Sequence, residues 1–383
     1  MKSSATINHL QWFTKALMLL CVVLYTGCIS PLDQEPEDFT DYLVVEGFID
    51  DDFGPHDLTI TRISKFADVF AGGVILPIDA EVTIIDQFGV RTPVERQVVI
   101  KKENFNVASP GCVPGTRFVE VKTVHQTPPS FKGEVGNTYT LEIRIDDKTY
   151  QSDPVTMLPT PPIESVEVRL KQLPSLDPSV IPSGIEVIAN WNDPPEERNY
   201  YQWIVNGIYP ISTPPIVGAC CLYDAFDGGE SECWIIENDI EGNEIAFSDT
   251  DVNGQLASLS VGFIEDNGLR FSSVSLPANK RYYLEVEQYS ISEEAFGFFE
   301  RIKTLSEISG DIFDPVAQSI RGNIYNVENN EEPVVGYFGA FSVQKKGFFV
   351  HDSTFTFRQP SKEACGDCRT RKGAQTEIPE PFR

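Results

Sequence analysis

The sequence has few of the residues that most often act in catalysis or bind metals. It contains 4 histidines in 383 residues, and only His56, His125 and His351 follow the first 27 positions. Each stands alone, and no His-Glu-x-x-His pattern, Gly-x-Ser-x-Gly elbow, phosphate loop or dinucleotide fingerprint occurs. These absences argue against motif-based enzymes, so we expect no catalytic residue, no metal and no cofactor.

Positive charge is also scarce, with 30 Lys and Arg against 57 Asp and Glu, a net charge of −27. Such an excess repels the phosphates of nucleic acids and of anionic lipids, which excludes nucleic acid as a partner and direct adsorption to a membrane. Because acids are so numerous, a pair of catalytic carboxylates cannot be recognised in the sequence. A surface glycan hydrolase that uses such a pair therefore remains the alternative function.

A long hydrophobic run is missing as well. The apolar stretch Ala16–Tyr25 would cover roughly 15 Å as a helix, about half of a bilayer core, so it does not span a membrane. Ahead of it, Lys2 and Lys15 are the only ionised side chains. A basic start, a short apolar middle and a small residue before the cleavage point are typical of an export signal.

This signal ends in Leu24-Tyr25-Thr26-Gly27-Cys28, which resembles a bacterial lipobox, although Leu24 stands one position further from the cysteine than usual. We interpret residues 1–27 as a lipoprotein signal peptide and Cys28 as the lipidated residue. An ordinary secretory signal is the alternative.

Residues 28–41 are rich in acids and proline and predict a solvated tether that extends at most roughly 45 Å. Removal of residues 1–27 would take away two lysines and no acid, which leaves 57 acids, 28 bases and a net charge of −29. Membrane attachment would then depend on the acyl chains of the anchor, each buried methylene contributing about 0.8 kcal/mol.

An even number of cysteines remains beyond the anchor, which in an exported protein predicts disulfides. They are Cys112, Cys220, Cys221, Cys233, Cys365 and Cys368. We expect Cys233 to pair locally with Cys220 or Cys221, in a loop of about a dozen residues. Cys365 and Cys368 would then pair with each other or connect the tail to the body. Their Cys-x-x-Cys spacing also suits a metal, but one such pair is a weak signal.

Short strands with turn residues between them dominate the first half. In Tyr139–Ile145, apolar residues alternate with polar ones over seven positions, the clearest strand of the chain. No amphipathic helix interrupts this half, so residues 42–158 predict a β-sandwich. The segment Leu158–Pro162 carries three prolines and marks the expected boundary.

Strands resume beyond this boundary, for example in Ile185–Trp191, and predict a second sandwich over residues 163–360. Apolar residues at helical spacing predict one amphipathic helix over 291–308, with Ser290 and Glu293 as a capping box. The predicted fold is therefore mostly β, with two tandem immunoglobulin-like β-sandwich domains, the second with one helix. Residues 361–383 form a cysteine-containing tail.

Two further features have alternative interpretations. Asp249–Gly254 opens like a calcium loop, but Ser260 stands where that loop needs a bidentate glutamate, so an acidic turn and a weak calcium site both remain open. Aromatic residues of the second half either pack in a core or act as exposed anchors for a partner. These candidate partner-binding residues are Tyr200, Tyr201, Trp203, Tyr337 and Phe338.

Several short motifs follow one another in a fixed order, namely Leu43–Ile49, Gly136–Leu141, Pro161–Ile163, Asn199–Tyr201, Gly322–Val327, Gly336–Phe338 and the Cys-x-x-Cys tail. This order resembles a known family, the exported lipoproteins of the Bacteroidota catalogued as domain of unknown function 4249. The motifs span nearly the whole chain after the signal peptide, and each of them is structural in character. This resemblance implies a neighbour, because such lipoproteins are often encoded beside TonB-dependent outer-membrane transporters.

We therefore expect a non-enzymatic lipoprotein, anchored in the outer membrane on its periplasmic or cell-surface face, that acts as an accessory or binding partner of such a transporter. A purely structural surface protein is a further alternative.

Overall fold

We describe a computed structural model of the chain. It describes residues 42–63, 78–103, 118–172, 183–195, 198–212, 232–238, 240, 245–266, 270–271, 282–306, 321–350, 368 and 373–383. Contacts divide the chain into two compact units, Met1–Thr40 and Asp41–Arg383, and every element below belongs to the second unit. The predicted signal peptide and the predicted tether, residues 1–41, lie outside the described residues.

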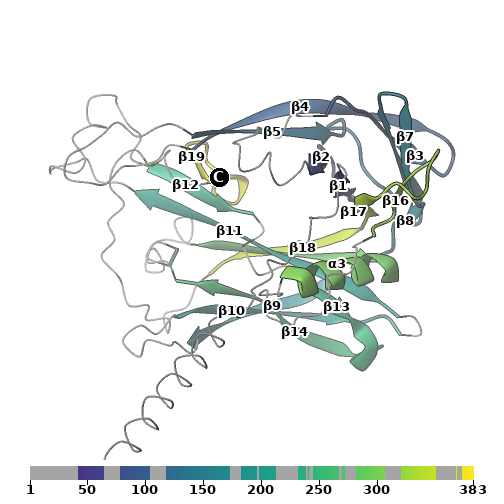
Figure 1. Cartoon of the computed structure of the whole chain (residues 1–383). Coiled ribbons are helices and arrows are strands. Elements are labelled where there is room, and N and C mark those ends of the chain that lie inside the picture. Colours follow the sequence, from purple (N-terminus) through teal and green to yellow (C-terminus); the bar gives the residue numbers. More distant parts are fainter. Residues whose placement is uncertain are drawn as a thin grey trace, which may run out of the picture. The chain divides into compact units, whose positions relative to one another are not determined.

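The first sheet has ten strands in the order β16-β7-β6-β3-β4-β5-β2-β1-β17, with β8 paired to β6 (Figure 1). Its strands are β1 (Tyr42–Ile49), β2 (Asp57–Ile63), β3 (Glu81–Asp86), β4 (Arg91–Glu103), β5 (Phe118–Gln126), β6 (Thr138–Ile145), β7 (Lys148–Ser152), β8 (Val155–Thr156), β16 (Ile324–Asn326) and β17 (Val334–Ala340).

Two further sheets follow, a three-stranded one in the order β14-β10-β9 and a six-stranded one in the order β18-β15-β11-β12-β19, with β13 paired to β11. Their strands are β9 (Ile163–Gln172), β10 (Ser183–Asn192), β11 (Tyr200–Ser212), β12 (Glu232–Glu237), β13 (Ile245–Ser248), β14 (Leu256–Glu265), β15 (Tyr283–Ile291), β18 (Val343–Phe349) and β19 (Ala374–Gln375). The helices are α3 (Glu293–Ser306) and the short 3-10 turns η2 (Asp249–Asp251) and η5 (Glu380–Phe382).

The predicted alternation places side chains as expected in both halves. In β6, Tyr139, Leu141, Ile143 and Ile145 are buried in the core of the first sheet. In β10, every second residue from Ile185 to Trp191 is fully buried in a core shared by the three-stranded and six-stranded sheets. The prediction of a mostly β fold with one amphipathic helix is confirmed in the described residues.

The long strand β4 allows the first sheet to fold over on itself. Its first part pairs with β3, up to Val94 opposite Val82, and from Glu95 onward it pairs with β5. Two layers thereby share one strand, and Val82, Ile84 and Val94 join the same buried cluster as Val45 and Leu58, among others.

A parallel pairing joins the first described strand to a strand of the C-terminal half. β17 runs alongside β1 from Leu43 opposite Val334 to Ile49 opposite Ala340 (Figure 1). Residues 324–340 lie within the range expected for the second domain, yet β16 and β17 hydrogen-bond into the first sheet. The first sheet is therefore completed only by strands from the C-terminal half.

The outer edge of β17 is closed by a side chain. Asn323 donates from its amide nitrogen to the carbonyl oxygen of Phe338 at 2.9 Å and accepts from the Phe338 backbone N–H, also at 2.9 Å. This buried amide satisfies one donor and one acceptor of an edge strand, which otherwise invite pairing with another chain.

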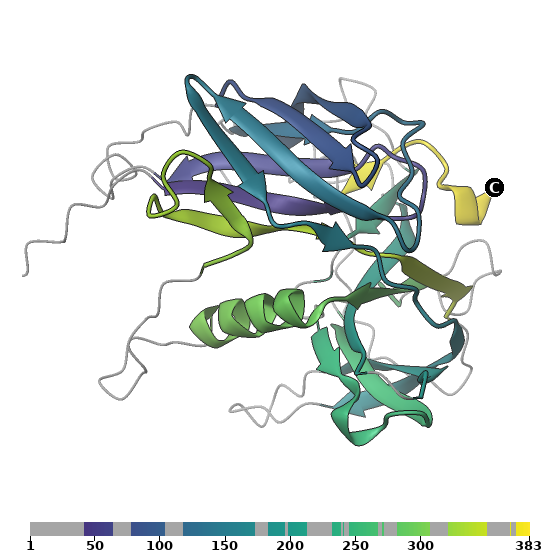
Figure 2. The same cartoon turned by 90° about the vertical axis from the view of Figure 1, so that its right-hand side faces the viewer.

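The helix α3 begins two residues later than the predicted capping box. Ser292 caps it, because its hydroxyl oxygen accepts from the Ala295 N–H at 3.2 Å. Ser290 instead belongs to β15 and donates to the Pro159 carbonyl oxygen at 3.0 Å. The helix, drawn in green in Figure 2, contacts β11, β13 and β17, and its apolar side chains pack in one cluster with Tyr200 of β11 and Tyr337 of β17.

The proline-rich segment after β8 is fixed to the C-terminal half. Thr160 donates from its hydroxyl to the Ser342 carbonyl oxygen at 2.7 Å, and the Ser342 hydroxyl donates to the Leu158 carbonyl oxygen at 2.6 Å. The segment predicted as the domain boundary is thus tied to the residues between β17 and β18.

We predict that Gly336→Ala strongly destabilises the fold, by about 3 kcal/mol or more, because Gly336 has φ +124° and a Cβ there would lie 1.8 Å from the Val45 carbonyl oxygen. Gly297→Ala is the control, since its Cβ would meet only the end of the Arg301 side chain, so we expect a gain of up to about 1 kcal/mol in α3. Urea unfolding of both variants measures this, and equal midpoints would contradict it.

Candidate functional site

The aromatic residues predicted as partner anchors in β11 lie in the core. Tyr201 and Trp203 are fully buried, and Trp191 packs on both, with ring centroids 5.6 Å and 5.0 Å away. The Tyr201 hydroxyl donates to Asp193 at 2.8 Å. The prediction of exposed anchors is wrong for both residues, because β11 is an interior strand whose one face forms the shared core.

The other three candidates are buried as well, which corrects the same prediction. Tyr200 packs against Phe296 in a tilted arrangement with ring centroids 5.0 Å apart, and Tyr337 packs against Phe298 at 5.3 Å. Phe338 belongs to the core of the first sheet. These strands have both faces covered, one by a core and the other by α3 or a neighbouring sheet.

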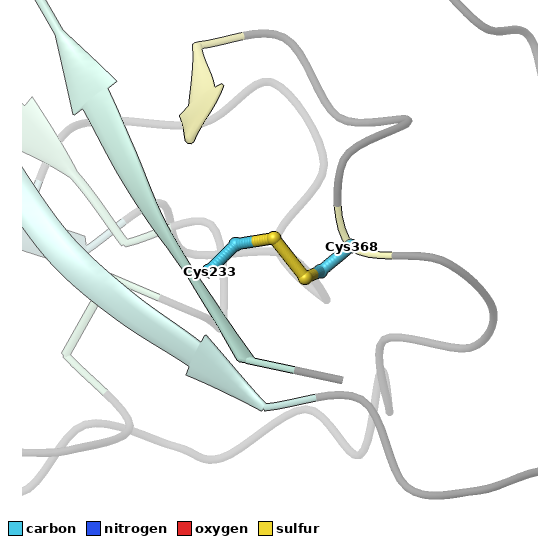
Figure 3. The surroundings of a disulfide bond; sticks show 2 residues. All are labelled: Cys233 and Cys368. Atoms are coloured by element: carbon cyan, nitrogen blue, oxygen red, sulfur yellow. A yellow bond between two sulfur atoms is a disulfide. The ribbon is translucent and has the colours of Figure 1, made fainter. Parts of the chain in front are cut away.

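The cysteines pair over a long range (Figure 3). Cys233 in β12 is bonded to Cys368, 135 positions later, with Cα atoms 5.8 Å apart. The local pairing predicted for Cys233 is wrong, and the alternative in which the tail is connected to the body is confirmed. Cys368 is therefore no metal ligand. The remaining candidates lie outside the described residues, namely Cys28, Cys112, Cys220, Cys221 and Cys365.

The suspected calcium loop forms a tight turn. Asp249 is buried and its carboxylate accepts from the Asn199 backbone N–H at 2.9 Å. The Gly254 N–H donates to Asp193 at 3.1 Å, so a second carboxylate holds the other end of the loop. The described residues contain no group of three or more His, Cys, Asp or Glu that could hold a metal. The structure supports the acidic turn.

The same two aspartates resemble the carboxylate pair beside a tryptophan that a glycan hydrolase would need. Asp193 lies near Trp191 and Asp249, and burial raises its pKa above 3.8. Both carboxylates are buried and are engaged by backbone N–H groups or by the Tyr201 hydroxyl, so they brace the loop rather than face a substrate.

A different group of ionisable residues meets where the first and six-stranded sheets join, and we call it the junction cluster. It consists of Asp50, Asp52, His56, Glu287 and Lys345. The first three come from the connection between β1 and β2, and the others from β15 and β18. The Lys345 amine lies 3.0 Å from Asp52 and 3.2 Å from Glu287, so one cation bridges both sheets.

His56 and Asp50 form the buried end of the junction cluster. His56 Nδ1 lies 3.6 Å from the Asp50 carboxylate, and the imidazole packs edge-on against Phe131. Burial lowers the pKa of His56 below 6.5 and raises that of Asp50 above 3.8, since a buried site disfavours charge. Both shifts favour a neutral pair.

The cation end of the junction cluster stays charged. Burial opposes the charge on Lys345, but the carboxylates of Glu287 and Asp52 outweigh it and raise the lysine pKa. The Tyr289 hydroxyl donates to the Glu287 carboxylate at 2.7 Å. The neighbouring Glu285 has a raised pKa, mainly because it is buried and also because of the negative charge of Glu287. These groups are engaged with one another, as a structural joint requires.

Sequence reasoning missed the junction cluster. The run Asp50–Asp52 has the composition of an ordinary turn, and Lys345, which pairs with Asp52, lies almost three hundred residues later. No sequence spacing signals such a pair. His125, also noted in the sequence, is buried separately, and burial lowers its pKa; His351 lies outside the described residues.

These observations define a class: a β-rich protein of several sheets in which aromatic cores, a long-range disulfide and a charged joint are structural. The family model described as "Domain of unknown function (DUF4249)" matches residues 29–347, and the chain belongs to this family. The resemblance seen in the sequence is thereby confirmed. Comparisons with curated proteins and with solved structures gave no match.

We predict that the fold loses stability as the pH falls through 6.5, the ordinary His pKa, because the unfolded chain binds protons that buried His56 resists. Asp50 has a raised pKa, so its protonation stabilises the fold as the pH falls, but only in a pH window that extends upward from its ordinary pKa of 3.8. The unfolding midpoint should therefore drop between about pH 7.5 and 5.5, and drop less in His56→Gln. Equal drops in both proteins would contradict this assignment.

We predict that Cys368→Ser destabilises the fold by about 3–5 kcal/mol, because the disulfide closes a long loop in the unfolded chain. Urea unfolding measures the loss. The wild type treated with a reductant is the matched control and should behave like the variant. A reduced wild type as stable as the oxidised one would show that the bond contributes little.

Proposed function

We propose that the chain is a lipoprotein anchored in the outer membrane, on its periplasmic or cell-surface face, and that it is a non-enzymatic partner of a TonB-dependent transporter. The observation that carries this proposal is the lipobox-like end of the apolar segment at Cys28, followed by acidic residues. None of the helices among the described residues is long and apolar enough to cross a bilayer.

The way in which the tether enters the fold supports an anchored role. Residue 41 leads directly into β1, which pairs with β2 on one side and with β17 on the other. A force on Tyr42 along the strand axis would act on the hydrogen bonds of β1 with both β2 and β17. Many of these hydrogen bonds would have to break at the same time before β1 could leave the sheet. Attachment at a central strand suits a chain held by its N-terminal end.

Membership of the family supports the transporter partnership only by association, because the family's function is unknown. The hydrolase alternative would require carboxylates open to a substrate. Among the described residues, the pair beside Trp191 is buried and hydrogen-bonded within the protein, so no observation favours that alternative.

The test uses the full-length protein with a C-terminal tag, purified from mildly solubilised native outer membranes. We expect an acylated N-terminal peptide beginning at Cys28 and co-purification of a TonB-dependent transporter. Cys28→Ala is the control and should release soluble protein without the transporter.

An unmodified N-terminus would contradict the anchor, and a wild type without the transporter would contradict the partnership. Glycan hydrolysis by the purified protein, abolished by one carboxylate substitution, would favour the enzyme instead.

A further inference from the structure

Four large apolar side chains stand in solvent on the loops of the first sheet, and we call them the apolar rim. Their exposed fractions are 72% for Phe53, 76% for Phe88, 59% for Val90 and 48% for Val135. A single exposed apolar residue is ordinary, but a group of them on neighbouring loops marks an interaction surface.

Strand directions bring these loops to one end of the sheet. β1 and β3 run the same way through the antiparallel series β1-β2-β5-β4-β3, and β6 runs opposite to β3. The ends of β1 and β3 and the start of β6 therefore meet at one end. Tyr42, where the tether joins the fold, lies at the other end of β1.

Hydrogen bonds hold the rim loops together. The Gly54 N–H donates to the Phe131 carbonyl oxygen at 2.8 Å, next to Phe53. At the far side, the Gln87 side-chain amide donates to Asn137 at 2.8 Å, next to Phe88. A rim whose backbone is already fixed loses little entropy on binding.

The turn that carries Phe88 is fixed independently of its ring. The Asp86 carboxylate accepts from the backbone N–H groups of Phe88 at 2.9 Å and Val90 at 2.8 Å, and Gly89 supplies the φ of +79° that the turn needs. Since these contacts use backbone atoms, both side chains can be replaced without loss of the turn.

Two of the three rim segments are electrically balanced within a strongly acidic chain. Segment 86–91 carries Asp86 and Arg91, and segment 131–137 carries Lys132 and Glu134, so each sums to zero against −27 for the chain. The loop of Phe53 carries three acids that are engaged inside the protein: Asp50 is buried, Asp51 accepts from the Val343 N–H, and Asp52 pairs with Lys345. The Lys132 amine lies 5.5 Å from the centre of the Phe53 ring. Interface cores are poor in charge and rich in aromatic residues, and this surface has that character.

We infer that the apolar rim is the surface through which the chain binds an uncharged, apolar patch on its integral outer-membrane protein partner. This inference rests on the proposed function and names the contacting residues. A second copy of the chain is disfavoured because each processed copy carries a net charge of −29, with 57 acids and 28 bases, and the anchoring bilayer is disfavoured because the tether joins the opposite end of β1.

The test compares two full-length lipidated double variants in native membranes. Phe88→Ser with Val90→Ser removes half of the rim. Leu256→Ser with Val98→Ser is the matched control, because these residues are 66% and 55% exposed and lie outside the rim. We expect the rim variant to lose about tenfold or more of the co-purified TonB-dependent transporter, while the control retains it and both keep the wild-type unfolding midpoint.

Each arm reports on one statement. A wild type that captures no transporter overturns the proposed function and this inference with it. A wild type that captures it equally well with and without the rim residues overturns the inference alone. Phe88→p-benzoylphenylalanine then identifies the occupant by photo-crosslinking: a crosslink to the transporter supports the inference, and one to lipid or to a second copy overturns it.

Discussion

The parallel pairing of β1 with β17 is the constraint on which the arrangement of the described residues depends. Gly336 permits the close approach of the two backbones, and its neighbours fix the register. β17 leads directly into Phe341, whose backbone N–H donates to the Ile49 carbonyl oxygen at 2.9 Å. The same register therefore decides where β18 starts, and with it how the six-stranded sheet meets the first sheet.

The junction cluster completes this connection with charge. The Val343 N–H donates to Asp51 at 2.7 Å, and Lys345 bridges Asp52 and Glu287, so the start of β18 is bound to the end of β1 through polar contacts. Beneath them, Phe48 packs against Tyr289 with ring centroids 5.1 Å apart. Burial of apolar side chains provides most of the free energy that holds the two sheets together. The hydrogen bonds and ion pairs of the junction cluster are directional and fix the position of β18 relative to β1.

Local sequence patterns were sufficient to predict where strands form, but not which distant residues and strands they pair with. The alternation in Tyr139–Ile145 is visible in the sequence because each strand repeats every two residues. The helix was also predicted, although Ser290 was taken for its cap instead of Ser292, an error of two residues where boundaries are least certain. Nothing local indicated that Cys233 would bond to Cys368, because a disulfide partner depends on tertiary geometry.

Burial of the predicted anchors has the same physical origin. A strand with one polar face and one aromatic face appears half-exposed in sequence, and Tyr200 and Tyr337 fitted that description. Their outward faces are covered by α3, which joins β15 to a segment that precedes β16. The exposed aromatic Phe88 stands instead in a turn between β3 and β4, where no periodic pattern in the sequence distinguishes an exposed ring from a buried one.

Under the proposed function, the lipid anchor would strengthen binding through the apolar rim, because it would raise the effective concentration of the chain near its partner. Four side chains cover less area than the roughly 1,200–2,000 Å² of a stable complex between free proteins. Under the proposed function a shared membrane would change this requirement, because a tether of at most roughly 45 Å would confine the chain near its partner and raise the local concentration to the millimolar range. In that arrangement the acidic body would repel anionic headgroups only within a Debye length of about 8 Å, so it would hold the fold off the lipid without opposing a contact made through the apolar rim. A small apolar rim on an acidic body is therefore consistent with the proposal that the chain and its partner are held in the same membrane.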